Sequence, residues 1–221
     1  MEKPLGFVFD LDGTLLNSLE DLADAANSSL SKMGFPSHPV EQYKYFVGDG
    51  VITLMKRILP PEKAEDEEVC AQFLSAYLAA YDQYWDKKTS PYPGVAELLD
   101  ALSAAGVRLG VFSNKPHRFT QLCVGKLLSR WHFDAVVGQS DEVPKKPDPT
   151  GALLIQKQWG FEPGRIAYVG DTATDMKTAA AAGFFSIGVT WGFRPESELR
   201  ESGACAIVHR PEEILELWQF A

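Results

Sequence analysis

Short apolar runs rich in β-branched and aromatic residues recur along the chain, separated by longer segments in which apolar residues return every three or four positions. An unbroken apolar run is typical of a strand buried on both faces, and the longer spacing is typical of an amphipathic helix. The predicted strands are residues 6–12, 107–114, 135–138, 166–171 and 185–190, with a weaker candidate at 205–210. The predicted helices between them are residues 93–106, 117–130, 149–160 and 172–183. Strands and helices that alternate through short connections predict a doubly wound parallel sheet, an α/β fold.

Residues 18–88 break this alternation. Three helical patterns follow one another there, at residues 19–34, 41–59 and 62–85, with no strand pattern between them. About seventy residues of helix exceed what a crossover between two parallel strands needs, since a dozen or more suffice. We therefore predict an α/β core made of residues 1–16 and 89–221, and a second, smaller, all-helical domain, residues 17–88, inserted in it.

Composition and charge narrow the possible partners. Hydrophobic residues make up 45% and charged residues 23% of the 221 positions, which is ordinary for a globular protein. The 21 basic and 30 acidic residues give a net charge of −9, which argues against a broad cationic surface for nucleic acid or anionic lipid. An anionic substrate would need positive charge supplied locally, by a lysine, a metal ion or a helix N-terminus.

The cysteines and the apolar segments bear on location. Cys70, Cys123 and Cys205 lie far apart without a CxxC spacing, which argues against a zinc site and a disulfide framework. The opening residues, MEKPLGFVFDLDG, lack the apolar core of a secretory signal, and no stretch approaches the ~18 consecutive apolar residues of a membrane span. We expect a cytoplasmic protein with no membrane or nucleic-acid partner, acting as a monomer or a homodimer.

Polar side chains follow the predicted strands, at the sheet edge where open parallel sheets bind their ligands. These residues are, in chain order, Asp10, Asp12, Ser113, Asn114, Lys115, Lys145, Lys146, Asp171, Thr172, Thr174 and Asp175. Carboxylates crowded without a counter-charge raise one another's pKa and lose their charge. Mg²⁺ removes that difficulty, because it prefers carboxylates, water and phosphate oxygens. A metal and a lysine would then allow an anionic nucleophile to approach an anionic substrate.

Four motifs carry a resemblance to a known family: DLDGT (10–14), SN (113–114), KKPDP (145–149) and GDTATD (170–175). In this order and at these separations, the chain resembles the haloacid dehalogenase-like (HAD) hydrolase superfamily over essentially its whole length. The predicted core is similar to the Rossmann-like domain of that superfamily, and the helical insert after the first motif resembles its first class of cap. The segments PYPGV (91–95) and VTWGFRPESEL (189–199) resemble the phosphoglycolate phosphatase-like branch.

The resemblance implies a Mg²⁺-dependent phosphatase acting on a small phosphorylated metabolite, with 2-phosphoglycolate as the leading substrate, through an aspartyl-phosphate intermediate. Asp10 would be the nucleophile, and Asp12 would be the general acid and then the base for the hydrolytic water. Ser113 would hold phosphoryl oxygens, and Lys146 would neutralise the nucleophile and phosphate. Lys145 remains the alternative to Lys146.

The resemblance also implies a set of ligands for Mg²⁺ and substrate. Asp10, the carbonyl of Asp12, and Asp171 would bind Mg²⁺, with Asp175 binding directly or through water. The candidates for substrate binding are Thr14, Ser113, Asn114, Lys146 and Gly50. Asp175 also suits the first turn of a helix, where the dipole favours acidic residues.

Several positions keep two interpretations. The break at residues 48–50 forms either a loop that faces the site or a simple helix break. If it faces the site, Tyr43, Lys44 and Arg57 are candidates for substrate contacts. The aromatic stripe of the insert is more typical of a helical core than of a recognition surface, and comprises Tyr77, Tyr81, Tyr84 and Trp85. His117 and Arg194 are given no catalytic role.

Other functions share these motifs. A phosphosugar mutase of the β-phosphoglucomutase type would use the same core, as would a HAD hydrolase acting on nucleotides or pyrophosphate. A non-enzymatic phosphate-binding module is disfavoured because every proposed carboxylate is present. A dehalogenase is disfavoured because halide displacement does not need the acid at Asp12.

Overall fold

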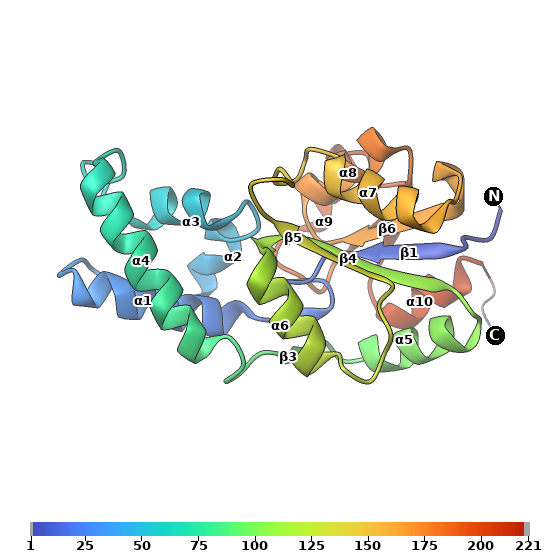
Figure 1. Cartoon of the computed structure of the whole chain (residues 1–221), viewed down its shortest axis with the longest axis horizontal. Coiled ribbons are helices and arrows are strands. Elements are labelled where there is room, and N and C mark those ends of the chain that lie inside the picture. Colours follow the sequence, from blue (N-terminus) through green and yellow to red (C-terminus); the bar gives the residue numbers. More distant parts are fainter. Residues whose placement is uncertain (1, 219–221) are drawn as a thin grey trace.

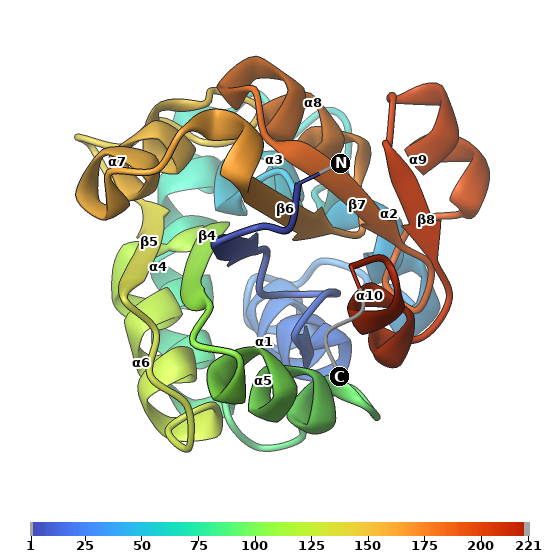
Figure 2. The ribbon, with the colours of Figure 1, turned by 90° about the vertical axis from the view of Figure 1, so that its right-hand side faces the viewer.

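The computed structural model describes residues 2–218 and contains one six-stranded parallel sheet (Figures 1 and 2). Its strands are β1 (Gly6–Phe9), β4 (Arg108–Pro116), β5 (Ala135–Gln139), β6 (Ile166–Gly170), β7 (Phe185–Val189) and β8 (Ala206–Val208). The strand order is β5-β4-β1-β6-β7-β8, so β1 lies between β4 and β6. Each of the six predicted strands is present, and the doubly wound α/β class is confirmed.

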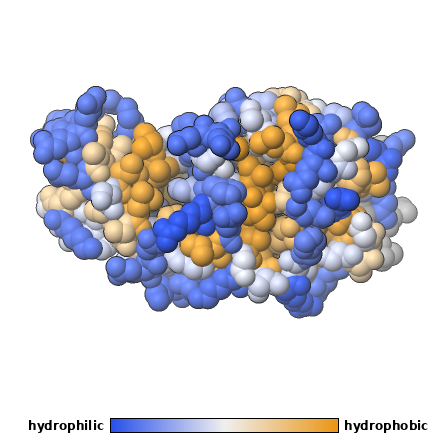
Figure 3. Space-filling model, viewed as in Figure 1, coloured by the Kyte–Doolittle hydropathy of each residue, from blue (hydrophilic) through white to orange (hydrophobic). Residues whose placement is uncertain are grey.

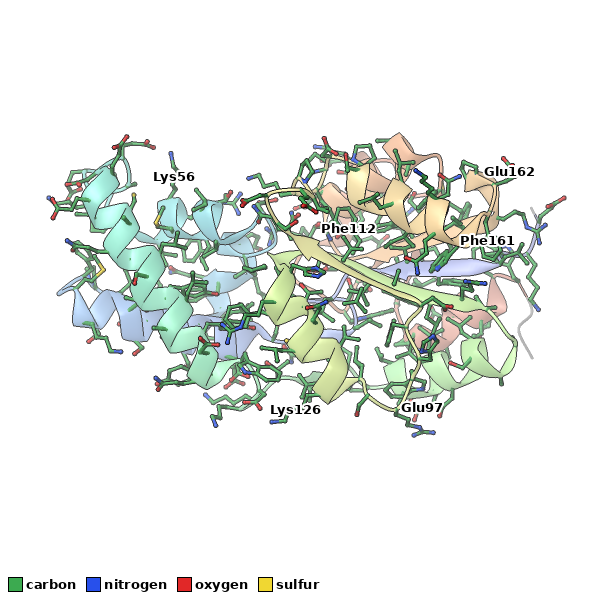
Figure 4. All side chains as sticks on the ribbon, viewed as in Figure 1. Lys56, Glu97, Phe112, Lys126, Phe161 and Glu162 are labelled. Carbon is green, nitrogen blue, oxygen red and sulfur yellow. The ribbon has the colours of Figure 1, made fainter. Side chains whose placement is uncertain are left out.

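Helices cover both faces of the sheet, which explains why the strands are apolar on successive residues. On one face, Phe7 and Phe9 pack with α5 (Val95–Ala104), α6 (His117–Leu127) and α10 (Pro211–Glu216). On the other, Val8 and Phe112 pack with α7 (Thr150–Trp159) and α8 (Ala173–Ala182). Figure 4 shows Phe112 between the sheet and α7. All four residues of β1 are buried, so either face contributes to a core.

Four helices of residues 18–88 lie beyond the carboxyl ends of the strands, at the left of Figure 1. They are α1 (Leu19–Lys32), α2 (Tyr43–Phe46), α3 (Val51–Ile58) and α4 (Glu67–Tyr84), with a short 3₁₀ turn at Val40–Gln42. They pack around a hydrophobic core of their own, which includes Leu30, Phe73 and Tyr77. The division into two domains at residues 17–88 stays a prediction.

Two short antiparallel strands join the helical segment to the sheet-bearing part. They are β2 (Leu16–Asn17) and β3 (Ser90–Pro91). The buried carboxylate of Asp21 ties this junction by accepting hydrogen bonds from the backbone N–H groups of Lys88 and Thr89 and from the Thr89 hydroxyl. The apolar pattern does not predict β2, β3 or the short helices α9 (Glu196–Glu201) and α10.

The molecular surface carries both hydrophilic and hydrophobic side chains (Figure 3). Figure 3 shows hydrophilic side chains over much of one face, with hydrophobic patches between them on the helical segment and over the sheet. None of the helices in residues 2–218 combines the length and apolar character that crossing a membrane requires.

Candidate active site

Three buried carboxylates meet at the carboxyl edge of the sheet. Asp10 follows β1, Asp171 follows β6, and Asp175 lies in the first turn of α8. One oxygen from each lies within 4.8 Å of the others. The strands bring them together because β1 pairs in parallel with β6, and Asp10 N donates a hydrogen bond to Val169 O at 2.9 Å.

The three carboxylates are short of positive charge. Burial raises the pKa of Asp10 to about 7; Lys146 lowers it and the charge of Asp175 raises it further. Burial, with the charges of Asp10 and Asp175, also raises the pKa of Asp171 well above its usual range. Asp10 and Asp171 are therefore poorly stabilised as anions by the protein alone, which is the condition that a bound cation corrects.

Lys146 is the cation closest to this cluster. Its Nζ donates a 2.6 Å hydrogen bond to Asp175 Oδ1 and lies 2.8 Å from Asp10 Oδ1, outside hydrogen-bond alignment. Burial would lower the pKa of Lys146, but Asp10 and Asp175 outweigh it and hold the pKa well above its usual range. Asp10 Oδ1 is buried, and Lys146 is its ion-pair partner among residues 2–218.

Asn114 positions Lys146 through its backbone. The Asn114 Oδ1 accepts from Lys146 N at 2.6 Å, and its Nδ2 donates to Lys146 O at 3.2 Å. Lys145 points elsewhere, since its exposed ammonium donates to Asp49 O at 3.3 Å and to Thr53 Oγ1 at 3.1 Å. The structure thus brings Lys146, and not Lys145, to the carboxylates.

Asp171 is fixed by close backbone packing. Its Oδ1 accepts from Thr14 Oγ1 at 3.1 Å, and its Oδ2 accepts from Phe193 N at 2.7 Å. A Cβ atom on Gly13 or Gly192 would lie 2.4 Å from Asp171 Oδ2, and Gly13 has a φ of +91°. Glycine is therefore required at both positions, and Thr14 is directed at Asp171.

Asp175 has two structural partners. Its Oδ2 accepts from Thr172 N at 3.0 Å, and its own N–H donates to Thr172 Oγ1 at 3.4 Å, which together form the capping box of α8. Its Oδ2 also accepts from Thr172 Oγ1 at 2.7 Å, and its Oδ1 accepts from Lys146. The helix-cap interpretation of Asp175 and its place in the carboxylate cluster therefore both hold.

Asp12 lies outside the group of three buried carboxylates and pairs with Lys115. Lys115 Nζ lies 2.9 and 2.6 Å from the two carboxylate oxygens of Asp12, and its side chain is 2% exposed. Burial would lower the pKa of Lys115, but the Asp12 charge more than offsets it and the pKa is raised. Sequence reasoning placed Lys115 at this edge without a role. Its position two residues after Ser113 was the available signal, because alternate residues of a strand share a face.

A pocket opens between the carboxyl edge of the sheet and the helical segment. The sheet side contributes Asp10, Asp12, Ser113, Asn114 and Lys115. The helical side contributes mainly apolar and backbone groups, including Val47, Gly48, Gly50, Leu54, Tyr77 and Tyr81. Tyr77 and Tyr81 are thus part of the helical core, as predicted for the aromatic stripe, and also line the pocket.

The loop at Val47–Gly50 faces the pocket and is held against the sheet-bearing part. Gly48 O accepts from Asn114 Nδ2 at 3.0 Å, and Val47 O accepts from Arg194 at 3.0 Å. The Asp49 carboxylate accepts from Thr174 Oγ1 at 3.0 Å. The break in the helical pattern therefore forms a loop at the site.

Three residues near this loop do not reach the pocket. Tyr43 is fully buried in the helical core and donates to Asn27 Oδ1. Lys44 pairs with Glu41, and Arg57 pairs with Asp49 at 2.7 Å. None of the three is among the pocket-lining residues of the described chain. His117 Nδ1 accepts a hydrogen bond from Gly138 N and likewise lies outside this pocket.

Comparison with known proteins identifies the family. The model of the haloacid dehalogenase-like hydrolase family matches residues 7–189. A phosphoglycolate phosphatase of Chromobacterium violaceum is 35% identical over 95% of this chain and 94% of its own. Two crystal structures named as predicted phosphoglycolate phosphatases are similar in fold. That from Lactobacillus delbrueckii subsp. bulgaricus has a TM-score of 0.91 and 30% identity over 98% of both chains. That from Haemophilus somnus has a TM-score of 0.88 and 29% identity over 98% of this chain and 99% of its own. The chain belongs to the haloacid dehalogenase-like hydrolase family.

Proposed function

We propose that this protein is a Mg²⁺-dependent phosphatase that hydrolyses 2-phosphoglycolate through a phosphorylated Asp10. The observation that carries the proposal is the buried group of Asp10, Asp171 and Asp175 with Lys146 beside it, of which Asp10 lines a pocket together with Asp12. The substrate comes from the named activity of the Chromobacterium violaceum relative, which matches nearly the full length of both chains.

The donor set fits Mg²⁺. Every candidate ligand is an oxygen, and Mg²⁺ prefers oxygen ligands together with waters and phosphate. Asp10 Oδ1 is buried, and its ion pair with Lys146 at 2.8 Å is shared with Asp175, so a single lysine serves two carboxylates and the group still lacks positive charge. Asp10, the carbonyl of Asp12, and Asp171 would bind the ion, and Asp175 would act through water or by holding Lys146. When bound, Mg²⁺ supplies the positive charge that lets a carboxylate approach a phosphate.

The chain's own residues then account for two successive displacements. An Asp10 carboxylate oxygen forms a bond to phosphorus as the bond from phosphorus to the leaving oxygen breaks, and Asp12 gives its proton to that oxygen. Asp12 then takes a proton from water, whose oxygen attacks phosphorus and displaces Asp10. Ser113 and Asn114 would lie beside the phosphoryl oxygens as polar groups, and Lys146 would neutralise their charge in the transition state.

The helical segment, residues 17–88, acts in this proposal as a cap over the substrate. The loop at residues 47–50 lines one side of the pocket, and Gly50 packs closely against β5, because a Cβ there would lie 2.9 Å from Gln139 Oε1 and the φ is +84°. The apolar wall excludes bulk water from the reacting groups, which strengthens their electrostatic interactions. The substrate is a small soluble metabolite, and we place the enzyme in the cytoplasm as a monomer or a homodimer.

Phosphate release from a panel of esters tests this proposal. The panel contains 2-phosphoglycolate, nucleoside monophosphates, sugar phosphates and pyrophosphate, each with Mg²⁺ and with excess chelator. We expect Mg²⁺-dependent release, greatest with 2-phosphoglycolate, and none from Asp10→Asn. Isomerisation of a phosphosugar without net phosphate release would instead support the mutase alternative, and release that is independent of Mg²⁺ would contradict the proposal.

A further inference from the structure

The pocket contains one buried cation that the hydrolytic steps do not use. Lys115 lines the pocket on the sheet side, and it is the one lysine or arginine among the pocket-lining residues of the described chain. Its ammonium lies 4.8 Å from the centre of the Tyr81 ring, which restrains it from the helical side. A lysine is rarely buried without a function or a pair, and Asp12 is its only carboxylate partner among residues 2–218.

The position of Lys115 relative to the reaction follows from Asp12. To protonate the leaving oxygen, Asp12 must come within about 3 Å of it. Lys115 Nζ lies 2.6 Å from an Asp12 oxygen, so it is within about 6 Å of the leaving oxygen, or two hydrogen-bond lengths. A charged group one carbon away from the leaving oxygen would therefore lie within reach of Lys115.

Two further features of the pocket favour a negative charge at this place. The eight-residue helix α3 begins at the pocket, which it lines with Gly50 and Val51, and a helix N-terminus carries a partial positive charge. The Tyr81 hydroxyl is buried with no hydrogen-bond partner among residues 2–218. Much of the rest of the helical wall, including Leu22, Leu54 and Leu78, is apolar and would not stabilise an anion.

We propose that Lys115 binds a carboxylate on the alcohol side of the substrate and so makes the enzyme selective for phosphate esters of short hydroxy acids. The inference rests on the proposed function and names the residue that sets its substrate class. Lys115 is shared between Asp12 and the incoming carboxylate, which an ammonium with three donors can do. Esters without an anion at this position cannot form this contact and do not gain its binding energy.

Two substrates that differ in one group test the inference. 2-Phosphoglycolate carries a carboxylate where 2-hydroxyethyl phosphate carries a neutral CH₂OH. The wild-type enzyme is expected to show a kcat/KM about 30-fold or more higher for 2-phosphoglycolate, the size expected for one buried charge pair. In Lys115→Met, which keeps the length of the side chain and removes its charge, this ratio is expected to fall close to one. Lys157→Met, at an exposed lysine of α7, is the matched control and keeps the wild-type ratio.

The outcomes separate this inference from the proposed function. If Lys115→Met lowers kcat/KM for both substrates by the same factor, the carboxylate contact is wrong while the hydrolase remains. Equal kcat/KM values of the wild-type enzyme for the two substrates would overturn the inference. This result needs no variant, so it applies even if Lys115→Met does not fold. Absence of phosphate release from every ester, with and without Mg²⁺, would overturn the proposed function and the inference together.

Discussion

The crowding of carboxylates predicts an unusual dependence of stability on pH for the protein without metal. The pKa of Asp10 is raised from 3.8 to about 7 by burial, so ionising Asp10 in the folded protein is costly. The free energy of unfolding therefore falls as the pH rises. The fall is absent below pH 3.8, grows as the pH approaches 7 and is complete above that value, because Asp10 ionises at a lower pH in the unfolded chain than in the folded protein. Asp10→Asn cannot ionise and removes this effect.

The size of the effect follows from the two pKa values. Between pH 5 and pH 8, the free energy of unfolding of the wild-type protein should fall by about 3 kcal/mol relative to that of Asp10→Asn, for a pKa moving from 3.8 to about 7. Lys146 keeps Asp175 as its partner in the variant, so the positive charge is not left unpaired. The predicted quantity is the difference in free energy of unfolding between the wild type and Asp10→Asn, compared at the two pH values. Groups that titrate in both proteins cancel from this difference.

Urea unfolding at pH 5 and pH 8 with excess chelator measures this difference. Asp141→Asn, at an exposed position of the described chain, is the control and should track the wild type at both values. Added Mg²⁺ at pH 8 should stabilise the wild-type protein more than Asp10→Asn, because a ligand that binds only the folded state stabilises it by mass action. A difference between wild type and Asp10→Asn that is the same at pH 5 and pH 8 would refute the account of the carboxylate cluster.

Three further changes give defined outcomes. Lys146→Met should abolish phosphatase activity. It should also lower the free energy of unfolding at neutral pH by about 3–5 kcal/mol in urea titrations, because it leaves buried carboxylates unpaired. Unchanged stability would contradict the buried ion pair. Asp49→Ala, which removes from the pocket loop both the hydrogen bond of Thr174 and the ion pair with Arg57, should raise KM severalfold and reduce stability by about 1–2 kcal/mol. An unaltered KM would show that the loop does not contribute to substrate binding. Gly13→Ala should lower the stability of the protein by more than about 2 kcal/mol, because the added Cβ would collide with a buried carboxylate. Gly34→Ala is the control: it is also at positive φ but has open space around it, and it should cost about 1 kcal/mol. Equal shifts in melting temperature for the two variants would contradict the role of close packing.

The sheet could be predicted because strands that are buried on both faces have apolar residues at successive positions. The strand Gly6–Phe9 is apolar at every position after its glycine, and the same pattern identifies Ile166–Gly170. The short helices α9 and α10 have only six residues each, too few for a helical period to become clear. The two-residue strands β2 and β3 are likewise below the length at which alternation is visible.

Part of the candidate site could be predicted because it depends on topology alone. Asp10 and Asp171 each follow a strand, and parallel neighbours bring such residues to the same edge. The contact of Lys115 with Asp12 could be predicted only on one side: Lys115 lies within β4 on the same face as Ser113, whereas Asp12 lies past the end of β1, where strand alternation no longer sets side-chain direction. The docking of the loop Val47–Gly50 depends on how the helical segment sits over the sheet, which periodicity within that segment does not encode.

The most direct test of the central claim is to detect a phosphoryl group on Asp10 during turnover. The wild-type protein would be mixed with 2-phosphoglycolate and Mg²⁺, quenched with acid within the first turnovers, digested, and analysed by mass spectrometry. We predict a phosphoryl group on the peptide that contains residue 10, located on Asp10, and none when Mg²⁺ is replaced by chelator. Steady release of phosphate by a protein that never carries phosphorus on this peptide, or by Asp10→Asn, would contradict the account.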